Sequence, residues 1–132
     1  MNARTLLYSL PALALLLLVA STAPARAEGP APPDVEKVVK KMIEAVKAES
    51  YDAFLADADT NLKEHLSRQQ FQDTCGRYTQ ALQKGYTLDY FGQLKQRGMV
   101  VYIWKVSVPG ESEDALVKLV MKEGKVTGVW VL

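Results

Sequence analysis

From residue 34 onward the spacing of apolar residues changes once, at Gly85, and this change limits the fold more than any other feature. Before Gly85, apolar residues recur at every third or fourth position, the spacing of a helix that buries one face. After Gly85, they alternate or form short runs rich in β-branched and aromatic residues, which is typical of strands. Helices followed by strands predict an α+β fold, with the N-terminal helices packed on one face of a sheet.

The helical part contains local start signals. Residues 34 to 48 form the clearest helix, with Pro33 suited to its first turn. Ser50 is a candidate cap for a short second helix, and the Ser-Arg-Gln-Gln stretch at 67 to 70 has the form of a capping box ahead of a third main helix. Gly85 provides the stop of that helix.

Four strands joined by short turns are predicted in the second part. They span about 86–94, 99–108, 115–121 and 125–132. Arg97-Gly98 and Glu123-Gly124 mark tight turns, and Gly92 lies where a bulge is tolerated. Consecutive strands with such connections predict a curved four-stranded antiparallel meander.

The first 27 residues have the organisation of an export signal. Arg4 provides a positive start, Leu6 to Ala20 an apolar stretch, and Ala25 to Ala27 small residues at the spacing of a cleavage site. The apolar stretch has about 15 residues, fewer than the roughly 20 that span a bilayer as a helix. The sequence therefore predicts a signal peptide at 1–27 and an exported protein, periplasmic or secreted. Membrane contact is expected only through an uncleaved signal.

Residues 28–33, Glu-Gly-Pro-Ala-Pro-Pro, predict a flexible linker ahead of a single domain at 34–132. The leader holds two of the 16 basic residues, Arg4 and Arg26, and none of the 15 acidic ones, so its removal changes the net charge from +1 to −1. A nearly neutral domain with both signs interspersed does not predict a nucleic-acid partner.

Metal and cofactor sites find no support in the sequence. His65 and Cys75 are the only histidine and cysteine, too few for a zinc site, and no internal disulfide can form. Asp57 and Asp59 lack the glycine and glutamate that a calcium loop requires. Cys75 shares a helix face with Phe71, Tyr78 and Leu82, which favours a buried apolar role. The prediction is no metal and no cofactor.

Four stretches of this chain resemble the small exported bacterial form of the nuclear-transport-factor-2-like superfamily of cone-shaped α+β domains. They are AESYDAFLAD at 48–57, LSRQQF at 66–71, VYIWKVSV at 101–108 and ALVKLVMKEGKVTGVWVL at 115–132. The resemblance implies a pocket between helices and sheet. Members of this superfamily range from isomerases and dehydratases to binding domains without catalysis, and a cystatin-like α+β fold is the alternative.

Candidate site residues come from the strand segments. Asp89 is the only acidic residue within a strand body, and a pocket carboxylate can act as a general base beside a tyrosine. Its position in the alternation is opposite to that of Tyr90, however, so it faces solvent if the tyrosine faces the helices. Aromatic residues that can line a ligand cleft are Tyr90, Tyr102, Trp104 and Trp130.

Three classes of function follow from these observations. The favoured one is an exported noncatalytic domain that binds a small apolar ligand or a protein partner through the helix–sheet cleft or the sheet face. The second is an isomerase- or dehydratase-like enzyme that uses Asp89 with Tyr90 or Tyr102. The third is a structural homodimer that associates through outer-face residues such as Val101 and Ile103.

Overall fold

The structure is a computed structural model that describes residues 29–132. The predicted signal peptide at 1–27 therefore lies outside the described residues. Within the described part, no helix is both long and apolar enough to cross a membrane.

Four helices precede the sheet, and two of them begin at the caps that the sequence predicts. They are α1 (Pro33–Lys47), α2 (Tyr51–Phe54), α3 (Thr60–His65) and α4 (Arg68–Gln83). The Ser50 hydroxyl accepts a hydrogen bond from the Ala53 amide at the start of α2. At the start of α4, Ser67 and Gln70 form both hydrogen bonds of a capping box. These side chains satisfy amides that a helix leaves without partners.

The sheet is the predicted antiparallel meander, with four strands in the order β1-β2-β3-β4, and it does not close into a barrel. Its strands are β1 (Thr87–Gln96), β2 (Met99–Ser107), β3 (Ala115–Lys122) and β4 (Lys125–Val131). Two-residue turns link β1 to β2 and β3 to β4. Arg97 and Gly98 have φ of 51° and 76°, and Glu123 and Gly124 have the same pair of values. Positive φ at both positions matches the right-handed twist of the strands.

Two bulges interrupt the sheet. In β1, Tyr90 pairs with Trp104 and Gly92 with Ile103, which leaves one extra residue between them. Gly92 has φ of 143°, in the region that favours glycine, as the sequence interpretation of this position requires. The second bulge lies between β3 and β4, next to Val120. Each bulge bends its strand and changes which residues face the helices.

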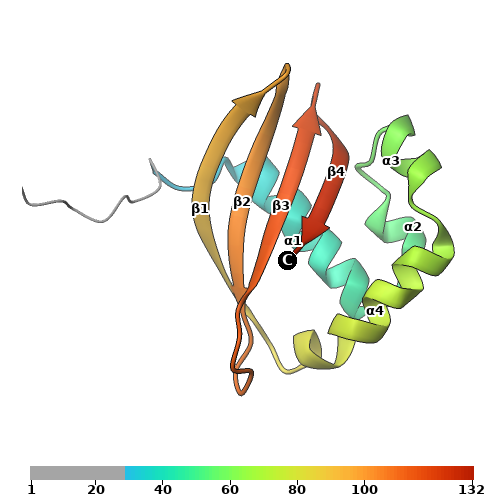
Figure 1. Ribbon diagram of the computed structural model, residues 1–132, viewed down its shortest axis with the longest axis vertical. Helices are drawn as coiled ribbons and strands as arrows, with labels where there is room; N and C mark the ends of the chain where they lie inside the picture. Colours follow the sequence, from blue (N-terminus) through green and yellow to red (C-terminus); the bar gives the residue numbers. More distant parts are fainter. Residues whose placement is uncertain (1–28) are drawn as a thin grey trace, which may run out of the picture.

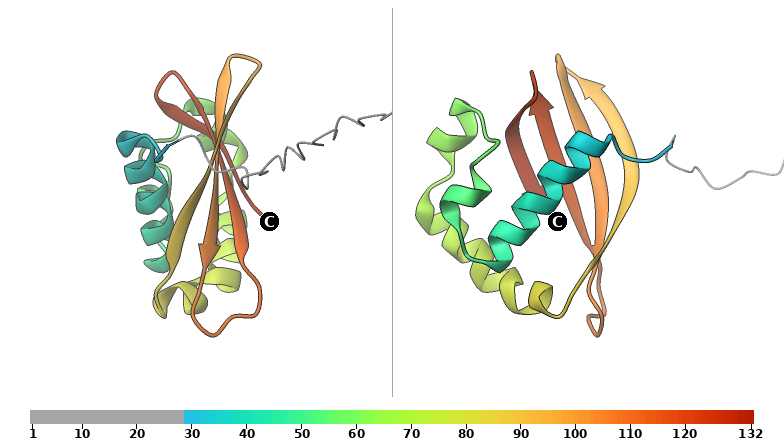
Figure 2. Two further views of the ribbon diagram at one scale, coloured as in Figure 1. Left: turned by 90° about the vertical axis from the view of Figure 1, so that its left-hand side faces the viewer. Right: turned by 180° about the vertical axis from the view of Figure 1, so that it is seen from behind.

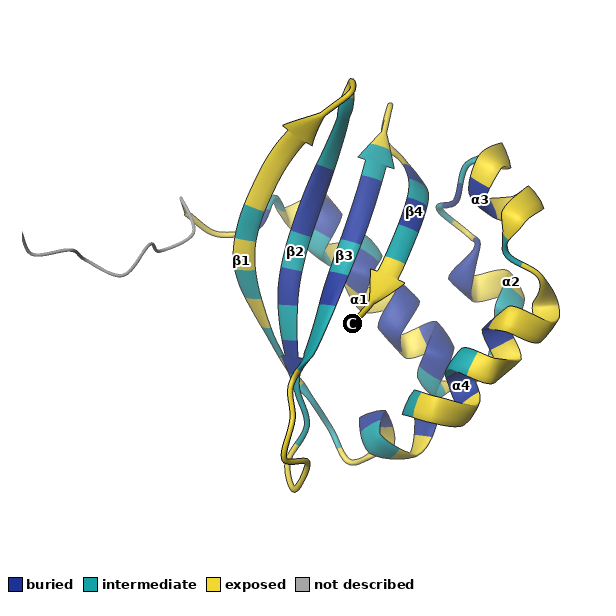
Figure 3. Cartoon of the chain, in the orientation of Figure 1, coloured by how far each residue is buried: buried dark blue, intermediate teal, exposed yellow. Residues whose placement is uncertain are grey.

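The helices cover one face of the sheet, and α1 crosses that face diagonally (Figure 1, Figure 2). The main core lies in this layer, and the burial colouring shows that α1 and α4 turn their buried residues inward (Figure 3). Its largest fully buried side chains are Trp104, Phe71, Leu119, Val39 and Val126. The fold is therefore α+β, as predicted.

The chain before α3 covers the free edge of β4. The Asp59 amide donates to the Val126 carbonyl at 2.8 Å, and the Val126 amide donates to the Asp57 carbonyl at 2.9 Å. Lys41 of α1 forms an ion pair with the Asp57 carboxylate at 2.7 Å. These contacts connect the helical half of the chain to the last strand, and α4 follows directly after α3.

Candidate ligand-binding site

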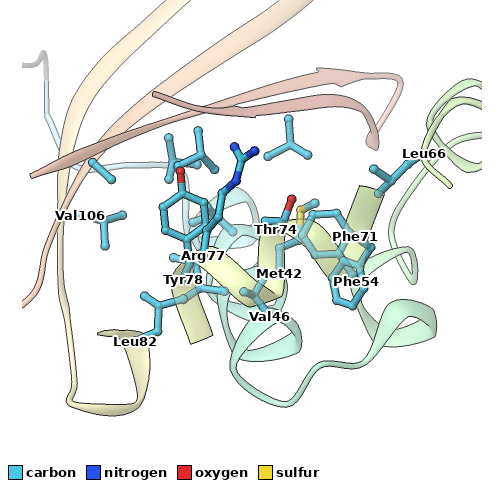
Figure 4. Close-up of a pocket in the computed structure, with 16 residues that line it drawn as sticks. Met42, Val46, Phe54, Leu66, Phe71, Thr74, Arg77, Tyr78, Leu82 and Val106 are labelled. Carbon is cyan, nitrogen blue, oxygen red and sulfur yellow. The ribbon is translucent and has the colours of Figure 1, made fainter. Parts of the chain in front are cut away.

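A cavity of about 210 Å³ lies between α1, α4 and the face of the sheet that the helices cover (Figure 4). Its strand side is made only of valine and alanine, from β2, β3 and β4. These short side chains do not fill the distance to α4, which explains why space remains there. The apolar lining residues are Val39, Met42, Ile43, Val46, Phe54, Leu66, Phe71, Leu82, Val106, Ala115, Val117, Val129 and Val131.

The helix side of the cavity is held by a buried hydrogen bond between α4 and α1. The Thr79 hydroxyl donates to the Val46 carbonyl at 2.9 Å, and Thr79 is the one polar residue among the buried residues of the described part. Such a bond fixes the rotation of α4 about its axis, because a buried hydroxyl left without a partner is costly. The residues on either side of Thr79 on α4 therefore have a defined direction.

Three residues of α4 supply the polar groups of the cavity: Thr74, Arg77 and Tyr78. Their spacing of three and four positions places them on one side of the helix. The side chains of Arg77 and Tyr78 extend from α4 toward the strands, with the guanidinium and the phenol oxygen near each other in the view of Figure 4. The Thr74 hydroxyl donates to the Gln70 carbonyl at 3.1 Å, so its proton is already used.

Sequence reasoning placed Tyr78 on the buried face of α4 but did not select Arg77. The signal was available in the spacing, because Arg77 follows Thr74 by three positions and lies beside the core face of Phe71 and Leu82. A charged residue at the border of a helix face is ordinarily solvated, however, and only the packed structure shows the cavity beneath it.

Of the four aromatic residues proposed from the sequence, three lie together. The Trp104 ring is 5.4 Å from the Tyr90 ring and 6.1 Å from the Tyr102 ring, measured between centroids. Burial raises the pKa of both tyrosines above the usual value for a phenol. These three residues pack with the main core and do not line the cavity.

Trp130, the fourth, lies on the opposite face of the sheet. It pairs with Lys118, whose ammonium is 4.5 Å from the centroid of its ring, and its side chain is 48% exposed. The structure thus separates Trp130 from the other three aromatic residues. Contact of any of the four with a ligand stays a prediction.

Asp89 also lies on the outer face, where the alternation of β1 predicts it. Its carboxylate is 3.5 Å from the Lys105 ammonium, with the side chain 56% exposed, and it does not line the cavity. A general base beside a pocket needs a carboxylate that burial makes more basic. Asp89 does not have that environment.

The other residues considered for chemical reactivity, Cys75 and His65, lie in environments typical of structural residues. Cys75 is 3% exposed, and burial raises the pKa of its thiol, which opposes formation of the reactive thiolate. The exposed His65 ring has its Nδ1 2.7 Å from the Asn61 carbonyl. Among residues 29–132, no three His, Cys, Asp or Glu side chains lie close enough together to hold a metal ion.

Fold and cavity define the class of protein as an α+β domain with an apolar pocket between its helices and an open antiparallel sheet. No protein-family model matches the chain, and neither does any curated protein sequence. Several solved structures are similar to this chain.

TerC, crystallised with polyporic acid, is 14% identical to this chain, with a TM-score of 0.44 over 76% of this chain and 91% of TerC. An NTF2-like protein of unknown function from Cytophaga hutchinsonii is 14% identical, with a TM-score of 0.39 over 74% and 87% of the two chains. A cystatin-fold protein from Novosphingobium aromaticivorans is 11% identical, with a TM-score of 0.40 over 73% and 95%. One of these structures is described as NTF2-like and another as a cystatin fold, and neither description gives a function.

Proposed function

We propose that this domain binds a small apolar ligand in the cavity between α1, α4 and the sheet. The supporting observation is the cavity itself, with a volume of about 210 Å³ and walls that are apolar except for three residues of α4. An apolar protein cavity of roughly 150 Å³ already takes up benzene. The cavity in this protein is therefore large enough for one aromatic ring or a short chain.

Substitution at two neighbouring positions of β3 tests this proposal. Ala115 lines the cavity, whereas Leu116 is the next residue and points to the other face of the sheet. Ala115→Phe fills the cavity, and Leu116→Phe adds a similar ring outside it. With toluene as the probe, we expect Ala115→Phe to weaken binding by about tenfold or more, equivalent to about 1.4 kcal/mol.

Carbon-13 methyl NMR supplies the measurement, because valines lie on both faces of the sheet. Toluene should shift the methyl signals of Val106 and Val117 in the cavity and leave that of Val101 on the outer face unchanged. Leu116→Phe should bind toluene as the unaltered protein does. If toluene shifts no methyl signal of the cavity at millimolar concentration, the proposed function is wrong.

We also propose that the protein acts after export, in the periplasm or outside the cell, with residues 1–27 removed. The supporting features are Arg4, the apolar stretch that follows it and the small residues before Glu28. The intact mass of protein recovered from the exported fraction should correspond to a chain that starts at Glu28. A cut two residues earlier fits the same prediction, and recovery of a chain that still carries Met1 contradicts it.

A second candidate function is self-association through the outer face of the sheet. Val101 and Val120 are buried there although they do not belong to the main core. Leu94 and Trp130 next to them are 41% and 48% exposed. Exposed apolar side chains that are contiguous with a second small cluster are typical of an interaction surface.

A further inference from the structure

The Arg77 side chain lies at an apolar cavity and has no negative partner in the described part of the chain. Asp73, four residues earlier on α4, is the position from which a carboxylate normally pairs with an arginine on a helix. Asp73 instead accepts a hydrogen bond from the Gln69 amide at 3.0 Å. Within residues 29–132, the ion pairs shorter than 4.0 Å do not include Arg77. Its guanidinium therefore retains donors for a ligand.

The Tyr78 hydroxyl has the same property. The Tyr51 hydroxyl donates to the Leu66 carbonyl and that of Tyr86 donates to Glu44, whereas the Tyr78 hydroxyl has no hydrogen-bond partner in the described part of the chain. The Tyr78 hydroxyl is also accessible. Every buried side-chain polar atom in the described part has a hydrogen-bond partner, and the Tyr78 hydroxyl has none, so it is not buried. A phenol can donate one hydrogen bond to a ligand.

The groups available to a ligand are thus a full positive charge and a phenolic donor, on adjacent residues of one helix. An arginine binds a carboxylate through two parallel hydrogen bonds, and this pairing is stronger than one between neutral groups. A neutral apolar molecule would use the walls of the cavity but neither of these donors. A cationic molecule would be repelled by Arg77.

Building on the proposed function, we infer that the ligand is a small organic carboxylate. Its apolar body occupies the cavity, and its carboxylate is bound by Arg77 with a further hydrogen bond from Tyr78. The volume of about 210 Å³ sets the size of that body. By comparison with the roughly 150 Å³ that holds benzene, the body is one ring or a short chain.

Phenylacetate and phenylacetamide test this inference, because they have the same shape and differ in charge. Calorimetric titration of the purified protein should show phenylacetate binding about tenfold more tightly than phenylacetamide, or better. Arg77→Met keeps the apolar stem and removes the charge. It should abolish the preference while the affinity for phenylacetamide changes less than about twofold, because the neutral amide forms no ion pair with Arg77.

Arg68→Met is the matched control. Arg68 is on the same helix and its substitution causes the same change in net charge, but it lies over the Tyr51 ring, 4.4 Å from the centroid, and does not line the cavity. This variant should retain the preference for phenylacetate. Tyr78→Phe, which removes only the hydroxyl, should weaken phenylacetate binding by about fivefold. Arg77 is exposed, and the uncharged polar variant Arg77→Gln replaces Arg77→Met if the latter does not fold.

The outcomes separate this inference from the proposed function. Equal affinity for the two probes overturns the carboxylate inference and leaves the apolar site in place. A preference that persists in Arg77→Met, or that is lost equally in Arg68→Met, overturns it as well, because the anion is then bound elsewhere or attracted only by overall charge. Failure of both probes to bind contradicts the proposed function itself.

Discussion

Trp104 and Trp130 show how a single position on a strand decides the environment of a side chain. Both lie on apolar strands, but Trp104 is 1% exposed inside the core and Trp130 is 48% exposed on the outer face. Trp104 pairs with Val117, which lines the cavity, and Trp130 pairs with Lys118, one residue further along β3. Because successive side chains on a strand point to opposite faces, this difference of one position separates the two indoles.

Gly128 lies against the indole of Trp130, and replacing it tests this contact. A Cβ atom at Gly128 would lie 2.5 Å from Cη2 of Trp130, so the indole must move if the residue is changed to alanine. Alanine also removes the backbone freedom of glycine, which favours the folded state by about 0.5 to 1 kcal/mol. We therefore expect Gly128→Ala to change stability little and to shift tryptophan fluorescence to longer wavelength, as Trp130 becomes more exposed.

The matched substitution is Gly76→Ala on α4, where a Cβ atom meets nothing within 4 Å. It should leave the fluorescence unchanged and raise helix stability by up to about 1 kcal/mol. An unchanged emission spectrum for Gly128→Ala would show that the indole does not lie over Gly128.

The starts of the helices and the tight turns depend on short-range signals, and for that reason they can be predicted from the sequence. The capping box at Ser67 and Gln70 and the cap at Ser50 involve residues three positions apart. The cap of α3 follows the same rule, since the Asp59 carboxylate accepts the Leu62 amide at 2.9 Å. Local hydrogen bonds of this kind can be predicted because no distant part of the chain is needed to form them.

The Asp59 cap of α3 predicts that stability depends on pH. The hydrogen bond from the Leu62 amide lowers the pKa of the Asp59 carboxyl below 3.8, because it favours the charged form. The stabilisation is therefore present above pH 3.8 and is lost as the pH falls through the lower pKa of the folded state. Asp59→Ala should cost about 1 kcal/mol at neutral pH, measured by urea unfolding.

Asp59→Asn separates the contribution of the cap hydrogen bond from that of the carboxylate charge, because asparagine caps a helix without a titrating group. It should be nearly as stable as the unaltered protein at neutral pH and should lose less stability on acidification. An equal loss in both proteins between neutral pH and pH 3 would contradict the assigned role of the Asp59 charge.

At the scale of the whole molecule, the helices cover one face of an open sheet and leave the other face to solvent. In Figure 1 the outer face is toward the viewer and α1 lies behind the sheet. The cavity is on the covered side, and the exposed apolar side chains of Leu94 and Trp130 are on the other. The two surfaces are independent, so ligand binding and self-association can be tested separately.

Sedimentation tests the outer face. We expect the unaltered protein to sediment as a dimer at high micromolar concentration, and Ile103→Lys to sediment as a monomer because it places a second ammonium directly opposite Lys118 on the outer face. Thr87→Lys, which adds the same charge at an exposed position near the end of β1, should still form the dimer. A monomer for the unaltered protein at that concentration rules out self-association as the function.

The sequence by itself determined the order of helices and strands, the caps at Ser50 and Ser67, the tight turns, the burial of Cys75 and the outward direction of Asp89. These features follow from spacing within a few residues, and spacing is visible in the sequence. Only the tertiary structure decided which residues surround the cavity, because Arg77 of α4 and Val129 of β4 are distant in sequence and meet through packing. It also decided that Arg77 has no carboxylate partner among residues 29–132, although Asp73 stands at the right spacing on the same helix and accepts a hydrogen bond from Gln69.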